Sequence, residues 1–310
     1  MVIDGRGELT PAEAAGIEAA IAASMARMGH LVAEYPIYVR PPEGRETMPA
    51  ATMIDTAHLR AYFERAIRDW SPDPTIEDER AAASRFMRRY VGSVAIAALV
   101  PVLNGVAFDV AIPRVQFVMS TYPGQSDMPM GVVLDLPAEV LGTADRPTPW
   151  PLTVSRFVSL DELRATAVRS MINDHLEPAI ARVLEAVHLS PKVLWASVAE
   201  VVDLIYEGYF EGADPRTSTD EYARAEADKA AVLMVPQLPG IVGPNPMFDL
   251  LEWERIDDQR LPRPVHWRKV CCANFVIPGR PTPYCRTCGL LPAEERSRLW
   301  REFAARLAQG

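Results

Sequence analysis

Apolar residues recur at helical spacing along most of the chain, and several of these stretches begin with a capping signal. A serine or threonine stands three residues before an acidic residue at Thr10, Thr75, Ser159 and Ser218. In this pattern, side chain and backbone cap each other at a helix N-terminus. Together with the Ser-Pro step at 190–191, these signals predict helices over 11–28, 57–70, 76–103, 160–187, 191–209, 219–234 and 293–308.

Short runs rich in β-branched and aromatic residues lie between these helices. The runs at 106–112 and 114–120 flank a proline, and the run at 131–136 follows a turn-rich stretch. Such runs predict a small antiparallel sheet or hairpin, and 248–254 is a further candidate strand. We therefore expect an α+β fold, predominantly helical, with a small antiparallel sheet in the middle and a cysteine-rich segment at the C-terminal end.

Two prolines and one charge-free run refine this picture. Pro178 should kink or split the helix over 160–187, because proline cannot donate its backbone hydrogen bond. Residues 91–108 carry no charge, and eighteen apolar residues approach the lower limit for a membrane span. Pro101 and the Asn104-Gly105 turn interrupt the run. We expect a buried helix end and no transmembrane segment, with peripheral membrane association left open.

Proline-rich linkers suggest where the chain divides. The linker at 143–151 predicts a helical region with central strands over 1–150. A helical region with the cysteine segment follows over 151–310, unless the chain forms one continuous domain.

The cysteines carry the most specific candidate chemistry. All four lie within eighteen residues, at Cys271, Cys272, Cys285 and Cys288. Two disulfides would suit a secreted chain, but the polar, acidic N-terminus does not resemble a signal peptide. Four thiolates can hold either zinc or an iron–sulfur cluster. Spacing alone favours zinc, because Cys285 and Cys288 have the spacing of a zinc knuckle. The adjacent pair, Cys271 and Cys272, does not have this spacing.

The surroundings of the cysteines are basic in an otherwise acidic chain. Residues 260–291 contain six Arg and Lys residues and no Asp or Glu, whereas the whole chain has a formal net charge of −9. Nearby cations would offset the charge of a thiolate-bound centre and raise its reduction potential. The alternative is a solvated basic loop. The acidic balance of the whole chain argues against a nucleic-acid partner.

Other motifs are few. The chain has neither a dinucleotide-binding glycine pattern nor a phosphate-binding loop, so a reductase built on it would need an external electron donor. Four side chains are weaker candidates for contact with a substrate or donor, although Trp195 is expected mainly to pack in the core. They are His266, Arg268, Arg280 and Trp195.

Two stretches resemble the FhuF-type ferric siderophore reductases. One is Trp267-Arg-Lys-Val-Cys-Cys with the later Cys285-Arg-Thr-Cys288. The other is Asp174-His-Leu-Glu-Pro-Ala followed by Leu189-Ser-Pro-Lys-Val-Leu-Trp-Ala-Ser-Val-Ala199. Together they cover roughly 155–290. The spacer of twelve residues between the cysteine pairs departs from about ten in the family.

The resemblance implies a cytoplasmic oxidoreductase that passes single electrons to siderophore-bound Fe(III), commonly in a hydroxamate complex. It also implies one 2Fe–2S cluster with Cys271, Cys272, Cys285 and Cys288 as ligands, and an electron-donor protein such as a ferredoxin. A zinc-stabilised binding or scaffold protein without redox activity and an iron–sulfur sensor are the alternatives.

Overall fold

The computed structural model confirms a predominantly helical α+β protein with small sheets. It describes residues 9–26, 28, 34–71, 73–121, 128–136, 139–212, 219–261, 263–277 and 284–307. The helices are α1 (Pro11–Ala26), α3 (Ala50–Met53), α4 (Thr56–Arg68), α5 (Ile76–Leu103), α6 (Leu160–Met171), α7 (Glu177–Ala186), α8 (Pro191–Gly212), α9 (Thr219–Leu233) and α10 (Ala293–Leu307). The strands are β1 (Ile37–Tyr38), β2 (Thr47–Pro49), β3 (Val106–Ala107), β4 (Val115–Met119), β5 (Pro129–Leu134), β6 (Glu139–Gly142), β7 (Thr153–Phe157), β8 (Leu251–Glu254) and β9 (Val265–Arg268).

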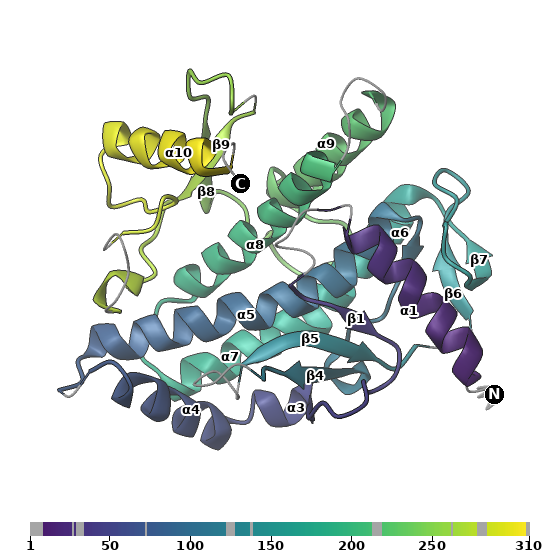
Figure 1. Ribbon diagram of the computed structural model, residues 1–310, viewed down its shortest axis with the longest axis horizontal. Helices are drawn as coiled ribbons and strands as arrows, with labels where there is room; N and C mark the ends of the chain where they lie inside the picture. Colours follow the sequence, from purple (N-terminus) through teal and green to yellow (C-terminus); the bar gives the residue numbers. More distant parts are fainter. Residues whose placement is uncertain are drawn as a thin grey trace.

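Helix α5 runs through the middle of the molecule (Figure 1). Its predicted capping box forms between Thr75 and Asp78. From Ala81 onward most of its residues are buried, because α4, α6, α8 and β5 surround it. The helix is long and apolar enough to cross a membrane, but 89% of its most apolar window is buried inside the protein. Apolar residues on all its faces are therefore explained by its place in the core.

The predicted central hairpin is present and belongs to a larger, mixed sheet. Strand β4 pairs antiparallel with both β5 and β2, whereas β1 pairs parallel with β5. A second sheet has the order β3-β6-β7, and its β6 and β7 are parallel. The strand predicted over 106–112 shortens to β3, and a 3-10 turn around Pro113 follows at Ile112–Arg114. The turn expected before β5 falls on 122–127, outside the described residues.

Pro178 splits its helix, as predicted. Helix α6 passes into one π-helical turn, η2 (Ile172–Leu176), before α7 begins. Proline lacks the N–H that an α-helix requires, and a wider turn relieves the clash of its ring with the preceding turn.

The π-helical turn carries a fully buried histidine. Nδ1 of His175 lies 2.5 Å from the carbonyl oxygen of Val110, and Nε2 lies 2.6 Å from the hydroxyl of Tyr90. A carbonyl can only accept, so Nδ1 carries the proton and Nε2 accepts from Tyr90. Burial lowers the pKa of His175 to about 4. The ring is therefore neutral at physiological pH.

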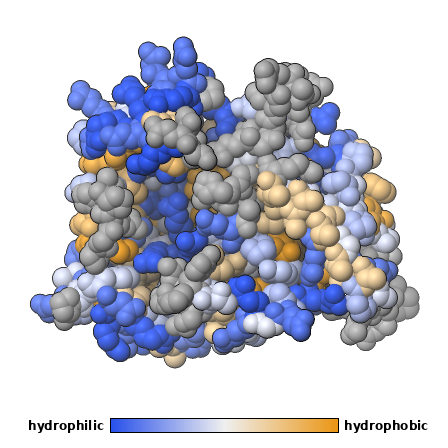
Figure 2. Space-filling view, in the orientation of Figure 1, coloured by the Kyte–Doolittle hydropathy of each residue, from blue (hydrophilic) through white to orange (hydrophobic). Residues whose placement is uncertain are grey.

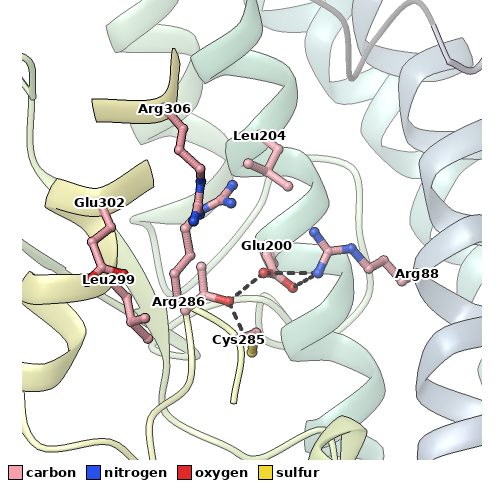
Figure 3. Close-up of a pocket in the computed structure, with 9 residues that line it drawn as sticks. Arg88, Glu200, Leu204, Cys285, Arg286, Leu299, Glu302 and Arg306 are labelled. Atoms are coloured by element: carbon pink, nitrogen blue, oxygen red, sulfur yellow. Dashed lines mark hydrogen bonds and ion pairs between the residues drawn. The ribbon is translucent and has the colours of Figure 1, made fainter. Parts of the chain in front are cut away.

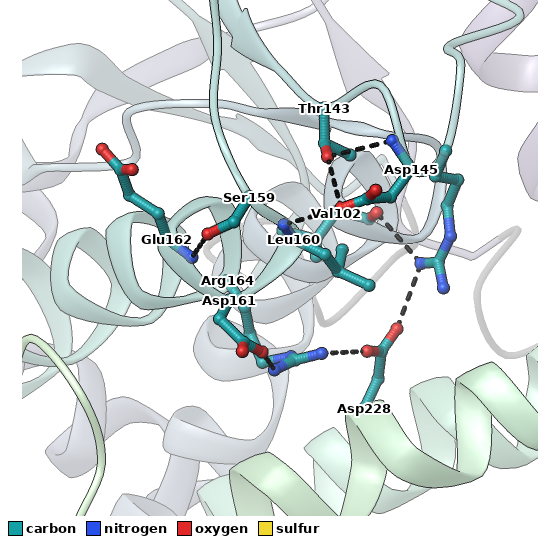
Figure 4. Close-up of polar contacts among 10 residues, drawn as sticks. Val102, Thr143, Asp145, Ser159, Leu160, Asp161, Glu162, Arg164 and Asp228 are labelled. Atoms are coloured by element: carbon teal, nitrogen blue, oxygen red, sulfur yellow. Dashed lines mark hydrogen bonds and ion pairs between the residues drawn. The ribbon is translucent and has the colours of Figure 1, made fainter.

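A buried carboxylate on α9 binds two arginines, one on α6 and one in the segment between β6 and β7 (Figure 4). Asp228 on α9 binds Arg164 of α6, and its other oxygen lies 3.0 Å from Nη1 of Arg146. The backbone of Arg146 lies against Gly105, where a Cβ would stand 1.7 Å from the Arg146 carbonyl oxygen. Gly105 also has a positive φ of 79°, so glycine is required at this turn for two reasons.

The C-terminal segment packs against the helical body through α8 and the start of α5. Strands β8 and β9 form an antiparallel hairpin. The strand predicted from 248 begins later, because Asp249 has a positive φ of 60°. Helix α10 covers the hairpin with a small apolar cluster that contains Trp267 and Trp300. The main core draws residues from Ile17 to Leu251; the division of the chain at 150 stays a prediction.

Candidate metal centre

The four cysteines lie in two parts of the C-terminal segment. The adjacent pair, Cys271 and Cys272, follows β9, and the knuckle, Cys285 and Cys288, precedes α10. In the knuckle, the N–H of Cys288 donates to the carbonyl of Cys285 at 3.0 Å. Cys272 and Cys288 are buried, whereas Cys271 and Cys285 are half-buried.

Backbone contacts bring the two cysteine pairs together. The N–H of Arg268, at the end of β9, donates to the carbonyl of Thr287 inside the knuckle at 2.9 Å. Directly after the knuckle, a Cβ on Gly289 would lie only 2.0 Å from the carbonyl oxygen of Arg268. The two chain segments can therefore approach this closely only because residue 289 is glycine.

The four cysteine side chains lie close enough to shift one another's pKa values. The interacting pairs are Cys271 and Cys288, Cys288 and Cys285, and Cys285 and Cys272. All four cysteines of the protein thus lie in one group.

Three of the sulfurs also accept a backbone hydrogen bond from the residue two positions further along the chain. The donors are the N–H groups of Ala273 (3.3 Å), Asn274 and Leu290. The hydroxyl of Thr287 lies 3.7 Å from the sulfur of Cys285, but it donates its proton to Glu200 at 2.8 Å. Hydrogen bonds of this kind stabilise thiolate and tune the potential of a cluster held by it.

The thiols divide into two that ionise readily and two that do not. The hydrogen bond from Cys288 lowers the pKa of Cys271 to about 6, and contacts with Cys272 and Cys288 hold the pKa of Cys285 well below its usual value. The pKa values of Cys272 and Cys288 are raised by the same contacts and by burial. The four groups titrate together, and binding of a metal would release the protons that remain.

The cysteines fit a four-thiolate cofactor in donor type. Four cysteines are the ligands of a 2Fe–2S cluster, and the same set serves structural zinc. Within the described residues, however, no three His, Cys, Asp or Glu side chains are arranged as ligands of one metal ion.

Three carboxylates along α8 bind three basic side chains of the C-terminal segment. The pairs are Glu200 with Arg268 (3.5 Å), Asp203 with His266 (2.5 Å) and Glu207 with Arg263 (2.7 Å). Steps of three and four residues place these carboxylates on one helix face. We call this set the α8 carboxylate ladder.

The ladder shows where part of the basic segment finds its counter-ions. Residues 260–291 contain no Asp or Glu, but α8 supplies carboxylates to Arg263 and Arg268. Lys269 pairs with Asp249, and Arg260 pairs with Asp258 at 2.7 Å, two residues before it in the chain.

Glu200 is a junction between the helical body and the cysteines (Figure 3). Its side chain is 1% exposed. It lies 3.3 Å from Nη1 of Arg88 on α5, and it accepts a 2.8 Å hydrogen bond from the hydroxyl of Thr287 in the knuckle. Burial opposes its ionisation, but the cations of Arg88 and Arg268 hold the pKa of Glu200 below its usual value.

Arg268 is the cation most closely associated with the sulfurs. It is 2% exposed. Burial by itself would lower its pKa, but Glu200 and the sulfurs of Cys272 and Cys285 raise the pKa of Arg268 above the usual value for arginine. It is also within hydrogen-bonding reach of Cys272.

A cavity of about 240 Å³ opens beside the knuckle, between α5, α8 and α10. In Figure 2 hydrophilic residues line the hollow between α10 and the centre of the molecule. The charged residues and the cysteine in its wall are Arg88, Glu200, Cys285, Arg286, Glu302 and Arg306.

The four weaker candidates for contact with a substrate or donor lie in different places. His266 is buried against Asp203 and Trp300. Trp195 packs on the main core, as expected of it by default. Arg268 lies at the cysteines, and Arg280 falls outside the described residues.

Sequence reasoning missed Glu200, Thr287 and Arg88. A signal for Glu200 existed, since carboxylates at 200, 203 and 207 interrupt an apolar helix at one-face spacing. Ionised groups on an apolar face require partners.

The chain belongs to the FhuF-like ferric iron reductase family. The family described as "Ferric iron reductase FhuF-like transporter" matches residues 84–259, which is more than half of the chain and ends before the first cysteine. The match confirms the resemblance read from the sequence. Ferric iron reduction is the activity in the family's description, and it places the chain among the oxidoreductases at that coarse level.

No curated protein matches the chain. Among solved structures, the chain is similar to aerobactin synthetase IucC from a hypervirulent pathotype of Klebsiella pneumoniae, with a TM-score of 0.42 and 12% identity. That similarity covers 66% of this chain and 36% of the synthetase, so this chain spans about a third of that structure.

Proposed function

We propose that this protein is a ferric siderophore reductase that works through a 2Fe–2S cluster held by Cys271, Cys272, Cys285 and Cys288. The observation that carries the proposal is the proximity of the four cysteine side chains, which shift one another's pKa values, with a polar group of the residue two positions further along the chain near each sulfur. Family membership supplies the ferric substrate.

When bound, such a cluster takes up one electron and passes it to Fe(III), and the resulting Fe(II) leaves the siderophore, whose hard oxygen donors hold it weakly. The residues of this chain would set the stability of the thiolates and the reduction potential of the cluster. Hydrogen bonds to the sulfurs stabilise the thiolates. The Arg268 cation favours the more negative state of the centre and so raises its reduction potential. Glu200 keeps Arg268 and the knuckle in place.

The remaining parts of the proposal come from the resemblance and from the motifs. The electron comes from a separate donor protein such as a ferredoxin, since the chain carries no dinucleotide motif. The substrate is a hydroxamate complex, and the protein works in the cytoplasm.

Metal content is the first test. Protein purified without oxygen should be red-brown and should contain two iron atoms and two sulfides per chain. Each Cys→Ser variant should lose most of both, whereas Ser197→Ala, which changes a buried hydroxyl near Arg268, should keep them. Stoichiometric zinc and no iron would replace this proposal with the scaffold alternative.

Electron transfer is the second test. Chemically reduced protein is mixed anaerobically with a ferric trihydroxamate and a ferrous chelator. The cluster should be reoxidised with release of about one Fe(II) per stored electron, and mass spectrometry should recover intact siderophore. Failure of reoxidation with hydroxamate, catecholate and citrate-type complexes alike would refute the reductase function.

A further inference from the structure

Three arginines from three parts of the chain meet at the cavity beside the knuckle (Figure 3). Arg88 comes from α5, Arg286 from the knuckle and Arg306 from α10. Arg88 pairs with Glu200. In the part of the chain that the structure describes, no carboxylate forms an ion pair with Arg286 or Arg306, and Nε of Arg286 is buried without a hydrogen-bond partner.

The two carboxylates at the cavity do not balance these cations. Glu200 is shared with Arg268, and Glu302 is held by Arg298 outside the cavity. In the wall itself three guanidinium groups face two carboxylates, and each of these carboxylates also binds an arginine outside the wall. A cavity with this excess of cations favours an anionic occupant.

The packing of Arg286 suits hydrogen bonding to such an occupant. Its guanidinium lies 3.7 Å from the ring centroid of Phe303 and 4.8 Å from that of Trp300. A cation–π contact uses the charge of a guanidinium without using up its N–H groups, which can still donate. Planar guanidinium groups bind carboxylates through paired hydrogen bonds.

The size and the wall of the cavity define what can enter. About 240 Å³ is less than most drug-sized ligand pockets, so the cavity suits one arm of a larger molecule. Cys285 is part of the wall. An arm held there brings the rest of its molecule next to a proposed cluster ligand.

We infer that this cavity binds a free carboxylate carried by the ferric siderophore, and that the protein selects ferric complexes of net negative charge. The inference rests on the proposed function and narrows its substrate class: a hydroxamate complex that also carries a carboxylate, or a citrate-based complex, is favoured over an uncharged trihydroxamate. The inner wall formed by Glu200 and Cys285 is recessed, which favours an arm of a small molecule over the surface of a donor protein.

Binding can be measured without electron transfer. Gallium(III) has the charge of Fe(III) and nearly its size but is not reduced under these conditions. The cluster-loaded protein is titrated calorimetrically with the gallium complexes of a citrate-based polycarboxylate siderophore and of an uncharged cyclic trihydroxamate. The variants are Arg306→Gln and a control on the same helix, Arg301→Gln, whose exposed side chain is not part of the cavity wall.

Wild-type protein should bind the anionic complex more tightly, and increasing salt should weaken that binding. Arg306→Gln should weaken it about tenfold, as expected for one charge-assisted hydrogen bond, with less than a twofold change for the uncharged complex. Arg301→Gln should change neither.

Equal affinities of Arg306→Gln and wild type for the anionic complex would overturn the inference. If that variant instead slowed reduction by a ferredoxin, the cavity would belong to the donor. Neither result would contradict the proposed function. That function fails only if reduced wild-type protein delivers no electron to any ferric complex.

Discussion

Replacing Glu200 by glutamine removes one negative charge from the junction between the helical body and the cysteines. The glutamine keeps an oxygen that can accept the hydrogen bond of Thr287. It leaves Arg268, which is 2% exposed, without its carboxylate. Arg88 has a side chain 38% exposed, so water can solvate its charge.

The cost of this change follows mainly from Arg268. Removing one partner of a buried ion pair costs about 3–5 kcal/mol, because the other charge remains buried. The sulfurs of Cys272 and Cys285 remain near the guanidinium, so we expect the lower end. The free energy of unfolding of metal-free Glu200→Gln should fall by about 3 kcal/mol, as measured by urea denaturation under reducing conditions.

Two further variants test the reasoning. Glu302→Gln removes an exposed carboxylate from the same cavity, where its partner Arg298 is also exposed, and should cost less than about 1 kcal/mol. The double variant Glu200→Gln/Arg268→Met also removes the buried cation that Glu200→Gln leaves without its carboxylate, so at least half of the lost stability should return. If both Glu200→Gln and Glu302→Gln lost the same free energy of unfolding, burial of Glu200 and Arg268 would not be what makes their ion pair costly to break.

Two other predictions concern different parts of the fold. The unfolded chain protonates His175 near pH 6.5, whereas the folded protein does so only near its pKa of about 4. The free energy of unfolding should therefore fall by up to about 3 kcal/mol as the pH is lowered between these values. Denaturation of His175→Asn across this range should show a shallower dependence, and an unchanged slope would contradict the neutral assignment. Gly289→Ala should lose iron, because its Cβ would meet the Arg268 carbonyl oxygen at 2.0 Å. Gly16→Ala, whose Cβ meets nothing closer than 4.0 Å, should retain iron; equal retention in both would refute the close packing at 289.

The sequence was most informative where local chemistry decides the structure. Helix α5 begins and ends where predicted, because Thr75 and Asp78 cap its start and Asn104-Gly105 ends it. Pro178 splits its helix for a reason that is entirely local. The cysteine pattern and the flanking motif led to the family that the comparison confirms.

Features that depend on distant pairings could not be predicted in this way. Strand β1 is two residues long, too short for a periodic signal, and the parallel pairing of β6 with β7 depends on the route of the chain between them. The counter-ions of Arg263 and Arg268 lie on α8, many residues away in sequence, so the sequence did not show these pairs. The cavity combines α5, α8, the knuckle and α10, and only the folded chain brings them together.

The way the C-terminal segment is attached has a consequence for how the protein responds to loss of its cofactor. Helix α10 and strand β9 share a small apolar cluster separate from the main core, which β8 reaches through Leu251. Much of their link to the body is ionic, through the α8 carboxylate ladder. Proteins open locally in cooperative units, and regions with few shared apolar contacts open first. Ligand binding stabilises the unit that forms the site. Hydrogen exchange in β9 and α10 should therefore respond strongly to the presence of the cofactor, while exchange in α5 should barely change.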